Sequence, residues 1–394
     1  MNYEPNDLQS DQYYLDRVNA KGAWDVAKGN QNVVIAVVDN AVLTSHEDLT
    51  NRIWTNEDET RDDGIDNDLN GYTDDKIGYD VADDNNDPNP PSKVKDEGRF
   101  SHGTHVAGLT GAHTDNRKGI ASLAFNTRIM PVKCSPDTSD GGILTNAYEG
   151  VYYAIQNNAD VISMSWGGPN MTVTGSNILQ TANNMGIVMI GAAGNDDTDQ
   201  KYYPAAYEEV IAVGATNKND QKANYSNFGD WIEVMAPGSN IYSCLAGTQS
   251  SYGRRSALIK ADDPGKSNEI IRKQIKQNCD DIDDKNSSYQ GQLGAGRINT
   301  AKAMNNTVGI NNFLKNSKPI EVYPNPANDQ FKLDGPQFGS LNGIFLKSIN
   351  AKTVKIWDQA PAKHAYAVDE LDPGIYILEI HQQMVIHRKR LIIQ

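Results

Sequence analysis

The most constraining feature of this 394-residue sequence is an alternation of short apolar runs with longer helical patterns, from Asn32 to about Ala303. Val33 to Val38 and Ile187 to Ile190 are apolar runs of strand length. Continuous apolar runs are typical of strands that are buried on both faces of a parallel sheet. Between them, apolar residues recur at helical spacing at Leu144, Ala147, Val151, Ala154 and Ile155. The alternation predicts βαβ units and an α/β fold.

Polar residues follow the predicted strands, where parallel sheets place their ligands. The first run ends at Asp39, and the run from Ile187 leads into Gly191-Ala192-Ala193-Gly194-Asn195. A further strand is predicted from Val161 to Trp166. The carboxyl edge of this sheet is therefore the expected place for a functional site.

A second domain is predicted beyond Ala303, because the chain length exceeds what one core usually supports. An asparagine-rich stretch at residues 305–318 is typical of a linker. The predicted domains are residues 12–304 and 319–394. The second contains short β-rich runs between turn signals, which predicts a small all-β sandwich. These runs are Ile320 to Tyr323, Phe331 to Leu333, Gly343 to Ile349, Val354 to Trp357, Ile375 to Ile380 and Arg390 to Ile393.

The composition excludes some partners. A formal net charge of −15 argues against nucleic acid or an anionic membrane surface, because both favour a basic face. No run of about 18 apolar residues exists, so no transmembrane segment is predicted. The polar start of the chain is not a signal peptide, so the leader of an exported protein would be absent from this sequence. The three cysteines are too few for a disulfide framework.

Much of the negative charge lies in one segment, where ten aspartates fall between Asp62 and Asp87 against a single lysine, Lys76. Within it, oxygen side chains alternate around a glycine as in a calcium loop. Ile77 stands where a bidentate glutamate would close such a loop, so a later aspartate would have to complete the ligand shell. The pattern predicts a stabilising Ca²⁺ site, with a solvated acidic loop as the alternative. The candidate ligands are Asp66, Asp68, Asn70, Tyr72, Asp74 and Asp75.

The strongest motif is Ser101-His102-Gly103-Thr104-His105-Val106-Ala107-Gly108, which places a histidine at the mouth of an apolar helical segment. It resembles the histidine motif of the subtilase family of serine proteases (peptidase S8), and the likeness extends from about Leu15 to Met304. The run ending at Asp39 is similar to the family's catalytic-aspartate strand, although Asn40-Ala41 stands where Thr-Gly or Ser-Gly is more usual. The resemblance implies a subtilisin-like parallel sheet with helices on both faces. His105 is interpreted as a structural residue.

The resemblance also implies roles in peptide-bond cleavage. Asp39 would hold the imidazole of His102 in one tautomer, and His102 would move the proton. Asn195 matches the family's oxyanion motif and would donate to the oxygen that becomes negative. Ser165-Trp166-Gly167-Gly168 is similar to the family strand that lines the substrate cleft, where glycine lets a peptide backbone approach and pair. For both of these segments an ordinary turn is the alternative.

The family's serine motif, Gly-Thr-Ser-Met-Ala, is missing from its expected place after Ala236-Pro237-Gly238. The chain runs instead through Gly253-Arg254-Arg255-Ser256, where the nucleophile and the start of its helix are absent by comparison with the family pattern. Ser250, Ser251 and Ser256 are the nearby serines, and none is expected to replace the nucleophile. Without a nucleophile, covalent acyl transfer has no first step.

The last segment of the chain resembles a second family in three places. Ile320-Glu321-Val322-Tyr323-Pro324-Asn325-Pro326-Ala327, Leu371-Asp372-Pro373-Gly374-Ile375-Tyr376-Ile377-Leu378 and the terminal Lys389-Arg390-Leu391-Ile392-Ile393-Gln394 are similar to the type A sorting domain of the type IX secretion system. This likeness implies export across an outer membrane to the medium or the cell surface, with the secretion machinery as a partner. A generic β-sandwich binding module is the alternative.

Three functional hypotheses follow. The first is a secreted serine endopeptidase that acts on polypeptides, impaired in this chain because the serine motif is missing. The second is a non-catalytic pseudoprotease or peptide-binding surface protein that keeps the cleft. The third is an active enzyme of which this sequence is an incomplete version.

Overall fold

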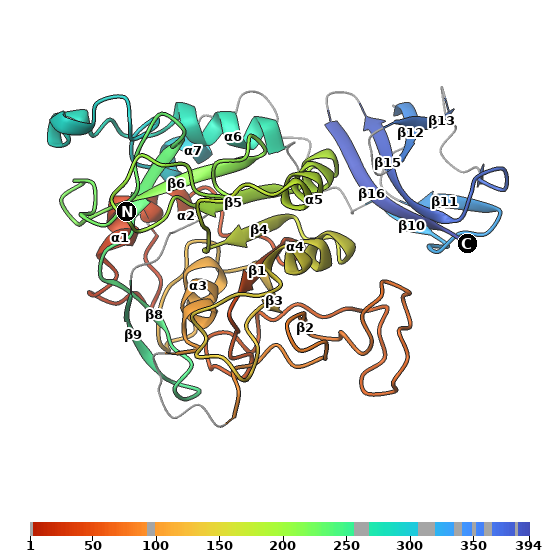
Figure 1. Cartoon of the computed structure of the whole chain (residues 1–394), viewed down its shortest axis with the longest axis horizontal. Helices are drawn as coiled ribbons and strands as arrows, with labels where there is room; N and C mark the ends of the chain where they lie inside the picture. Colours follow the sequence, from red (N-terminus) through yellow and green to blue (C-terminus); the bar gives the residue numbers. More distant parts are fainter. Residues whose placement is uncertain are drawn as a thin grey trace. The chain divides into compact units, whose positions relative to one another are not determined.

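The computed structural model describes residues 3–92, 99–255, 268–305, 320–334, 341–348, 352–357, 365–382 and 385–394. The chain forms two compact units, one around a parallel sheet and one around two antiparallel sheets (Figure 1). All of the predicted linker except Asn305 lies outside the described residues.

The larger unit contains a seven-stranded sheet in which every neighbouring pair of strands runs parallel. The predicted α/β fold with a parallel sheet is therefore confirmed. In spatial order the strands are β2 (Tyr79–Asp80), β3 (Arg128–Lys133), β1 (Val34–Asp39), β4 (Val161–Met164), β5 (Val188–Ala192), β6 (Val210–Thr216) and β7 (Val234–Pro237).

Residues 13–305 also form helices and a separate antiparallel hairpin. The helices are α1 (Tyr13–Arg17), α2 (Ala20–Trp24), α3 (His102–Gly111), α4 (Ala147–Gln156), α5 (Val173–Asn184), α6 (Asn268–Gln277) and α7 (Thr300–Asn305), with short 3-10 turns at Asp283–Lys285 and Ser287–Tyr289. The antiparallel hairpin is formed by β8 (Ile241–Cys244) and β9 (Tyr252–Arg255).

Helices cover both faces of the parallel sheet. Ile35 and Val37 of β1 belong to a buried cluster that includes Val106 of α3. From the other direction, a Cβ added to Gly150 of α4 would lie 2.9 Å from Val38 Cγ1. Successive strand residues point to opposite faces, so α3 and α4 lie on opposite sides of β1. The prediction of helices on both faces is confirmed.

Two predicted boundaries differ from the structure. The helix predicted from Leu144 begins at Ala147, and the strand predicted to Trp166 ends at Met164. In both cases the apolar side chains outside the element face the cleft described below, so their burial reflects the cleft and not a helix or strand. Apolar periodicity alone does not separate these two causes.

The smaller unit is a β-sandwich, as predicted. Its two antiparallel sheets share one core, in which Phe331 and Leu333 of one sheet meet Ile344 and Leu378 of the other. The six predicted strands are present, and a further short strand, β14, was not predicted. The strands are β10 (Glu321–Tyr323), β11 (Gln330–Asp334), β12 (Leu341–Ser348), β13 (Thr353–Trp357), β14 (Tyr366–Ala367), β15 (Gly374–Gln382) and β16 (Val385–Ile393).

The topology of the larger unit brings the predicted site segments together. Strands β1, β4 and β5 are neighbours and run in the same direction, so their carboxyl ends share one edge. Asp39 ends β1, Ser165 follows β4, and Asn195 follows β5. This edge is where an open parallel sheet provides a ligand site.

Candidate functional site

The site is centred on Asp39 and His102. Nδ1 of His102 lies 2.8 Å and 2.9 Å from the two carboxylate oxygens of Asp39. The carboxylate is buried, whereas 35% of the His102 side chain is exposed. Because Nδ1 donates to the carboxylate, the ring is fixed in one tautomer with Nε2 free to accept a proton. The geometry is that of an orienting acid and a base.

The pKa of His102 is raised above its usual value. The negative charge of Asp39 is the largest cause, and its hydrogen bond acts in the same direction. Burial and the positive charge of Arg255 lower the pKa and oppose this shift. In contrast, burial lowers the pKa of His105 to about 3, and its Nε2 donates to the carbonyl oxygen of Ile241 at 2.9 Å. His105 is thus a neutral structural residue at physiological pH.

Asn40 holds the surroundings of this pair in place. Its Oδ1 accepts from the N–H of Gly103 at 3.0 Å, in the first turn of α3, where N–H groups have no partner within the helix. Its Nδ2 donates to the carbonyl oxygens of Arg99 and Gly141 at 3.1 Å and 2.9 Å. Asn40 is 1% exposed. The sequence showed only that Asn40 departs from the family pattern, whereas the structure shows the four segments that it joins.

The glycine after His102 is required by close packing. A Cβ added to Gly103 would lie 2.3 Å from the carbonyl oxygen of Ala41 and 2.9 Å from Asp39 Cβ. Real Cβ atoms do not approach main-chain oxygen so closely, so only glycine fits. This contact sets how near α3 comes to the end of β1.

A cleft of about 570 Å³ opens beside the pair. Ser165, Trp166 and Gly167 line it, as does the exposed Asn195. Gly168 does not, because its main chain pairs with Tyr203 through bonds of 3.0 Å and 2.8 Å. Three of the four predicted substrate-binding residues and the predicted oxyanion donor therefore face one cleft with Asp39 and His102.

The cleft also contains residues that were not assigned to it from the sequence. Gly141, Gly142 and Leu144, from the segment before α4, line the cleft, and so does Arg255 at the end of β9. No short motif signals these residues, because they reach the cleft only through the tertiary fold.

Among the described residues that line the cleft, Ser165 is the only serine. Ser251 lies elsewhere, in a turn in which its Oγ accepts from the N–H of Thr248 at 2.8 Å and its carbonyl oxygen accepts from Nε2 of His46 at 2.9 Å. Ser250 is exposed in the same turn. The third candidate, Ser256, lies outside the described residues.

The predicted calcium ligands do not converge as one set. Asp66 accepts from the N–H groups of Asn70 and Gly71, and Asp74 accepts from those of Asp63 and Gly64. The phenol of Tyr72 donates to Glu149 at 2.5 Å. Asp68 and Asp75 turn inward, and the amide of Asn70 donates to both, at 3.2 Å and 3.0 Å.

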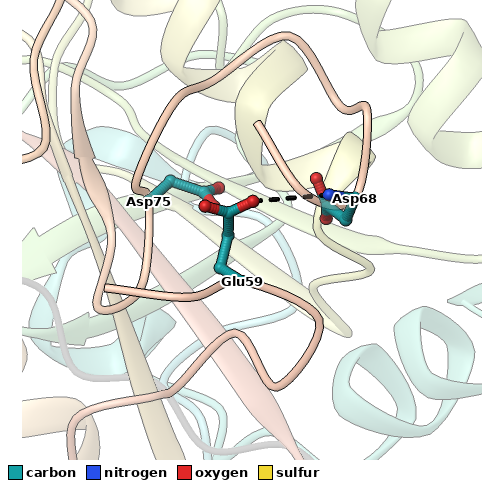
Figure 2. Close-up of side chains that lie close together, drawn as sticks. All are labelled: Glu59, Asp68 and Asp75. Carbon is teal, nitrogen blue, oxygen red and sulfur yellow. Dashed lines mark hydrogen bonds between the residues drawn. The ribbon is translucent and has the colours of Figure 1, made fainter. Parts of the chain in front are cut away.

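Glu59 completes an acidic cluster with Asp68 and Asp75 (Figure 2). One carboxylate oxygen of each residue lies within 4.8 Å of the others, and the three residues are 3%, 9% and 0% exposed. Burial raises the pKa of Glu59 and of Asp75. At an effective dielectric constant of about 20, two unit charges about 5 Å apart repel by about 3 kcal/mol. The cluster could hold a metal ion through oxygen ligands.

A second acidic cluster differs in carrying its own cation. Asp80, Asp83 and Asp137 surround the ammonium group of Lys133, which lies 2.5 Å from Asp80 Oδ2 and 3.8 Å from Asp83 Oδ2. Lys133 is 2% exposed. Its charge offsets part of the charge of the carboxylates, and its ammonium group takes the place between them.

A parallel α/β fold with an Asp–His pair at the carboxyl edge of its sheet is the arrangement of subtilisin-like serine peptidases. Residues 30–284 match the Subtilase family, and the chain belongs to that family. Residues 321–394 match the Secretion system C-terminal sorting domain. Both resemblances seen in the sequence are confirmed.

Several characterised proteases are similar to the chain. The thermophilic serine proteinase of Bacillus sp. (strain AK1) is 34% identical over 313 residues, which cover 77% of this chain and 69% of that protein. Thermitase of Thermoactinomyces vulgaris is 33% identical over 318 residues, which cover 77% of this chain and 99% of thermitase. A solved protease structure from Pseudoalteromonas arctica PAMC 21717 superposes with a TM-score of 0.62 at 27% identity, covering 77% of this chain and 99% of that one.

Across the described residues, no helix has both the length and the apolar character that a membrane crossing needs.

Proposed function

We propose that this chain is a secreted, subtilisin-like protein that binds polypeptide in the cleft beside Asp39 and His102, and that its acyl-transfer activity is impaired. The observation that carries the proposal is the Asp39–His102 hydrogen bond in a cleft lined by one serine, Ser165, among the described residues. Membership of the subtilase family supports a peptide as the ligand.

In the proposed reaction, His102 accepts the proton of a nucleophile at Nε2, and Asp39 stabilises the imidazolium that forms. The raised pKa of His102 is consistent with a carboxylate that favours the charged ring. The amide of Asn195 would donate to the oxyanion of the tetrahedral intermediate. An extended peptide would lie along Ser165 to Gly167 and pair with the main chain of this segment as an added strand.

Acyl transfer is proposed to be impaired because it begins with the attack of an oxygen that lies within hydrogen-bond reach of His102. Ser251 is held in a turn by Thr248 and His46, which argues against its use as that nucleophile. Binding and oxyanion stabilisation alone would leave only weak residual hydrolysis.

A fluorophosphonate serine-hydrolase probe tests the impairment. We expect no labelling of the full chain under conditions that label an active subtilisin, with His102→Ala as the background control. Labelling of Ser250, Ser251 or Ser256, mapped by mass spectrometry, would contradict the proposal. Sequencing of the coding DNA across Gly253 to Ser256 is the complementary test, because an intact serine motif there would identify an active enzyme.

A non-catalytic peptide-binding role is the second candidate, and Arg255 favours it. This residue lines the cleft, and its positive charge lowers the pKa of His102. A general base becomes an imidazolium during the reaction, and a neighbouring positive charge disfavours that charged form. Incubation with a fluorescent extended peptide separates the two roles. Binding with quantitative recovery of intact peptide supports the second role, and recovery of cleavage products supports the endopeptidase.

The C-terminal unit is proposed to direct export through the type IX secretion machinery. Its match to a secretion-system sorting domain supports this assignment. With the same leader peptide placed before both forms, deletion of residues 321–394 is expected to retain the protein inside a host that has the type IX system, whereas the full chain reaches the medium or the cell surface. Equal export of both forms would contradict the assignment.

Calcium is the proposed cofactor of the acidic segment. Carboxylate and carbonyl oxygens are the ligands that Ca²⁺ takes, and the buried acidic cluster supplies three carboxylates. EDTA is expected to lower the melting temperature of the larger unit, and added Ca²⁺ is expected to restore it. An unchanged melting temperature would count against a structural calcium ion.

A further inference from the structure

We infer that Glu59, Asp68 and Asp75 form a divalent-cation site that fastens the acidic loop to helix α4. The inference rests on the calcium binding proposed above. It adds a ligand set that differs from the alternating pattern of the loop, and a structural consequence of binding.

Glu59 is the residue that identifies the site. Its Oε1 accepts from the N–H of Asn67 at 2.5 Å, whereas its Oε2 is buried and has no hydrogen-bond partner among the residues that the structure describes. In Figure 2 the Glu59 carboxylate lies between Asp75 and Asp68. A buried carboxylate oxygen without a partner is costly unless a cation meets it. The orphaned oxygen therefore points to a ligand at the centre of the cluster.

The alternating side chains of the loop have other roles. Asp74 closes a turn through the N–H groups of Asp63 and Gly64, and Asp66 closes another through Gly71. Neither belongs to the group of converging oxygens. The side chains that resemble a calcium loop in the sequence thus shape the loop, and the cation ligands come from its two inward residues and from Glu59.

The lysine of the acidic loop makes its hydrogen bonds to main-chain oxygens and not to the cluster carboxylates. Lys76 is the only lysine between Asp62 and Asp87, and its Nζ donates to the main-chain oxygens of Asn56 and Glu59 at 2.6 Å and 2.8 Å. Among the described residues, no lysine or arginine forms an ion pair with Glu59 or Asp75. The cluster around Lys133 shows the alternative, in which a buried ammonium occupies the centre. A divalent cation would supply the charge that is missing here.

The site is connected to both ends of α4. Asn157, which caps the carboxyl end of α4, donates to Asp75 Oδ2 at 3.2 Å and accepts from Asn70 at 3.2 Å. In the first turn of the helix, Glu149 accepts from Tyr72 of the loop. Helix α4 packs against β1 next to Val38, one residue before Asp39. Binding of the cation would therefore hold α4 in place behind the Asp39 strand.

Terbium luminescence tests the ligand set with a readout that is independent of activity. Tb³⁺ takes oxygen ligands, and Tyr72, in the same loop, can sensitise it. We expect the full chain to bind Tb³⁺ and Ca²⁺ to displace it. Glu59→Gln and Asp75→Asn should weaken binding by about tenfold or more. Asp66→Asn and Asp74→Asn, which remove the same charge from the same loop, should weaken it by less than about threefold.

The outcomes separate this inference from the proposals above. Loss of binding in Asp66→Asn and Asp74→Asn, with Glu59→Gln unchanged, would overturn the ligand set and leave calcium binding intact. Failure of the unmodified chain to bind Tb³⁺ or Ca²⁺ would overturn both. Neither result bears on peptide binding in the cleft. Circular dichroism in EDTA checks that each variant is folded, and Asp68→Asn replaces any variant that is not.

Hydrogen exchange tests the connection to α4. Addition of Ca²⁺ to the full chain is expected to slow amide exchange in residues 147–157 as well as in the acidic loop. Glu59→Gln should abolish the slowing in both segments. Slower exchange in the loop with no change in α4 would overturn the connection.

Discussion

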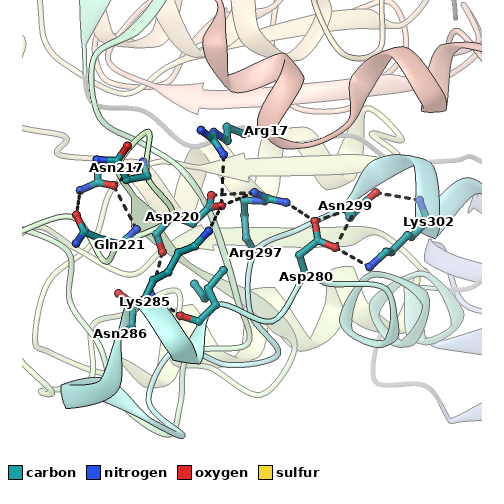
Figure 3. Close-up of polar contacts among 12 residues, drawn as sticks. Arg17, Asn217, Asp220, Gln221, Asp280, Lys285, Asn286, Arg297, Asn299 and Lys302 are labelled. Carbon is teal, nitrogen blue, oxygen red and sulfur yellow. Dashed lines mark hydrogen bonds and ion pairs between the residues drawn. The ribbon is translucent and has the colours of Figure 1, made fainter.

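Arg297 offers a quantitative test of how the larger unit is held together (Figure 3). Its Nη1 lies 2.8 Å from both carboxylate oxygens of Asp220, and its Nη2 pairs with Asp280. The side chains of Arg297 and Asp220 are 9% and 5% exposed. Lys302 also pairs with Asp280, at 2.6 Å, but 54% of its side chain is exposed. Arg297 is thus a buried cation of this network, whereas Lys302 is a cation at its surface.

Replacement of Arg297 by methionine removes the buried cation and keeps much of its apolar stem. Loss of one partner from a buried ion pair costs about 3 to 5 kcal/mol, because the other charge stays buried. Asp220 would keep Lys285 at 3.2 Å and Arg17 at 3.6 Å, both more than a third exposed. Exposed pairs contribute at most about 1 kcal/mol each, so we expect a loss of about 3 kcal/mol.

Urea unfolding followed by tryptophan fluorescence measures this loss. Trp357 is the only one of the five tryptophans in the smaller unit, so a Trp357→Phe background restricts the signal to the larger unit. Lys302→Met is the matched control and should cost less than about 1 kcal/mol. The double variant Arg297→Met, Asp220→Asn should recover part of the loss, because neither charge remains. A loss for Arg297→Met no larger than that of the control would refute the reasoning.

Two further predictions concern the cleft. The pKa of His102, measured by NMR, should be lower in Asp39→Asn and higher in Arg255→Gln. Arg254 is the control, because its guanidinium pairs with Asp11 outside the cleft, and Arg254→Gln should leave the pKa of His102 unchanged. The pKa of His102 is higher in the folded protein than in the unfolded chain, where it is about 6.5. The stability that Asp39 supplies through this pair is therefore fully present below the unfolded pKa and is lost as the pH rises through the folded pKa. Asp39→Asn should for this reason lower the free energy of unfolding more at low pH than at high pH. Asn40→Ala should lower the free energy of unfolding, measured by urea titration, by about 2 to 3 kcal/mol, because it leaves buried main-chain groups at Gly103 and Gly141 without their Asn40 partner. A loss below about 0.5 kcal/mol would contradict the role given to Asn40.

Much of the fold was predictable because buried parallel strands are apolar along their whole length. The run from Val33 to Val38 corresponds to β1, and the run from Ile187 to Ile190 to β5. Short elements were harder to predict from the sequence, because a two-residue strand such as β14 is too short to show an alternation of apolar and polar residues. Leu144 shows a limit of apolar spacing as a predictor of helices. It lies at helical spacing from Ala147 and Val151 in the sequence, but its side chain lines the cleft and lies outside α4.

The site was predictable in part, and the reason differs from residue to residue. Asp39 and His102 lie in motifs, and the order of the strands brings their segments to one edge. Glu59 was missed because its meeting with Asp75 depends on how the loop folds back, which no spacing rule for consecutive ligands describes. Asp74 illustrates a related point, because turn formation and metal binding both use aspartate oxygens, and its carboxylate accepts from the N–H groups of Asp63 and Gly64.

The geometry of the Asp39–His102 pair depends on contacts made within its own neighbourhood. The carboxylate of Asp39 fixes the ring, Asn40 holds the first turn of α3, and the close approach at Gly103 sets the distance between helix and strand. None of these contacts uses a residue between Gly253 and Ser256. The pair can therefore form whether or not a nucleophile is present, and peptide binding does not require acyl transfer. For this reason the comparison of intact and cleaved peptide addresses the proposed function more directly than a measurement of fold or stability.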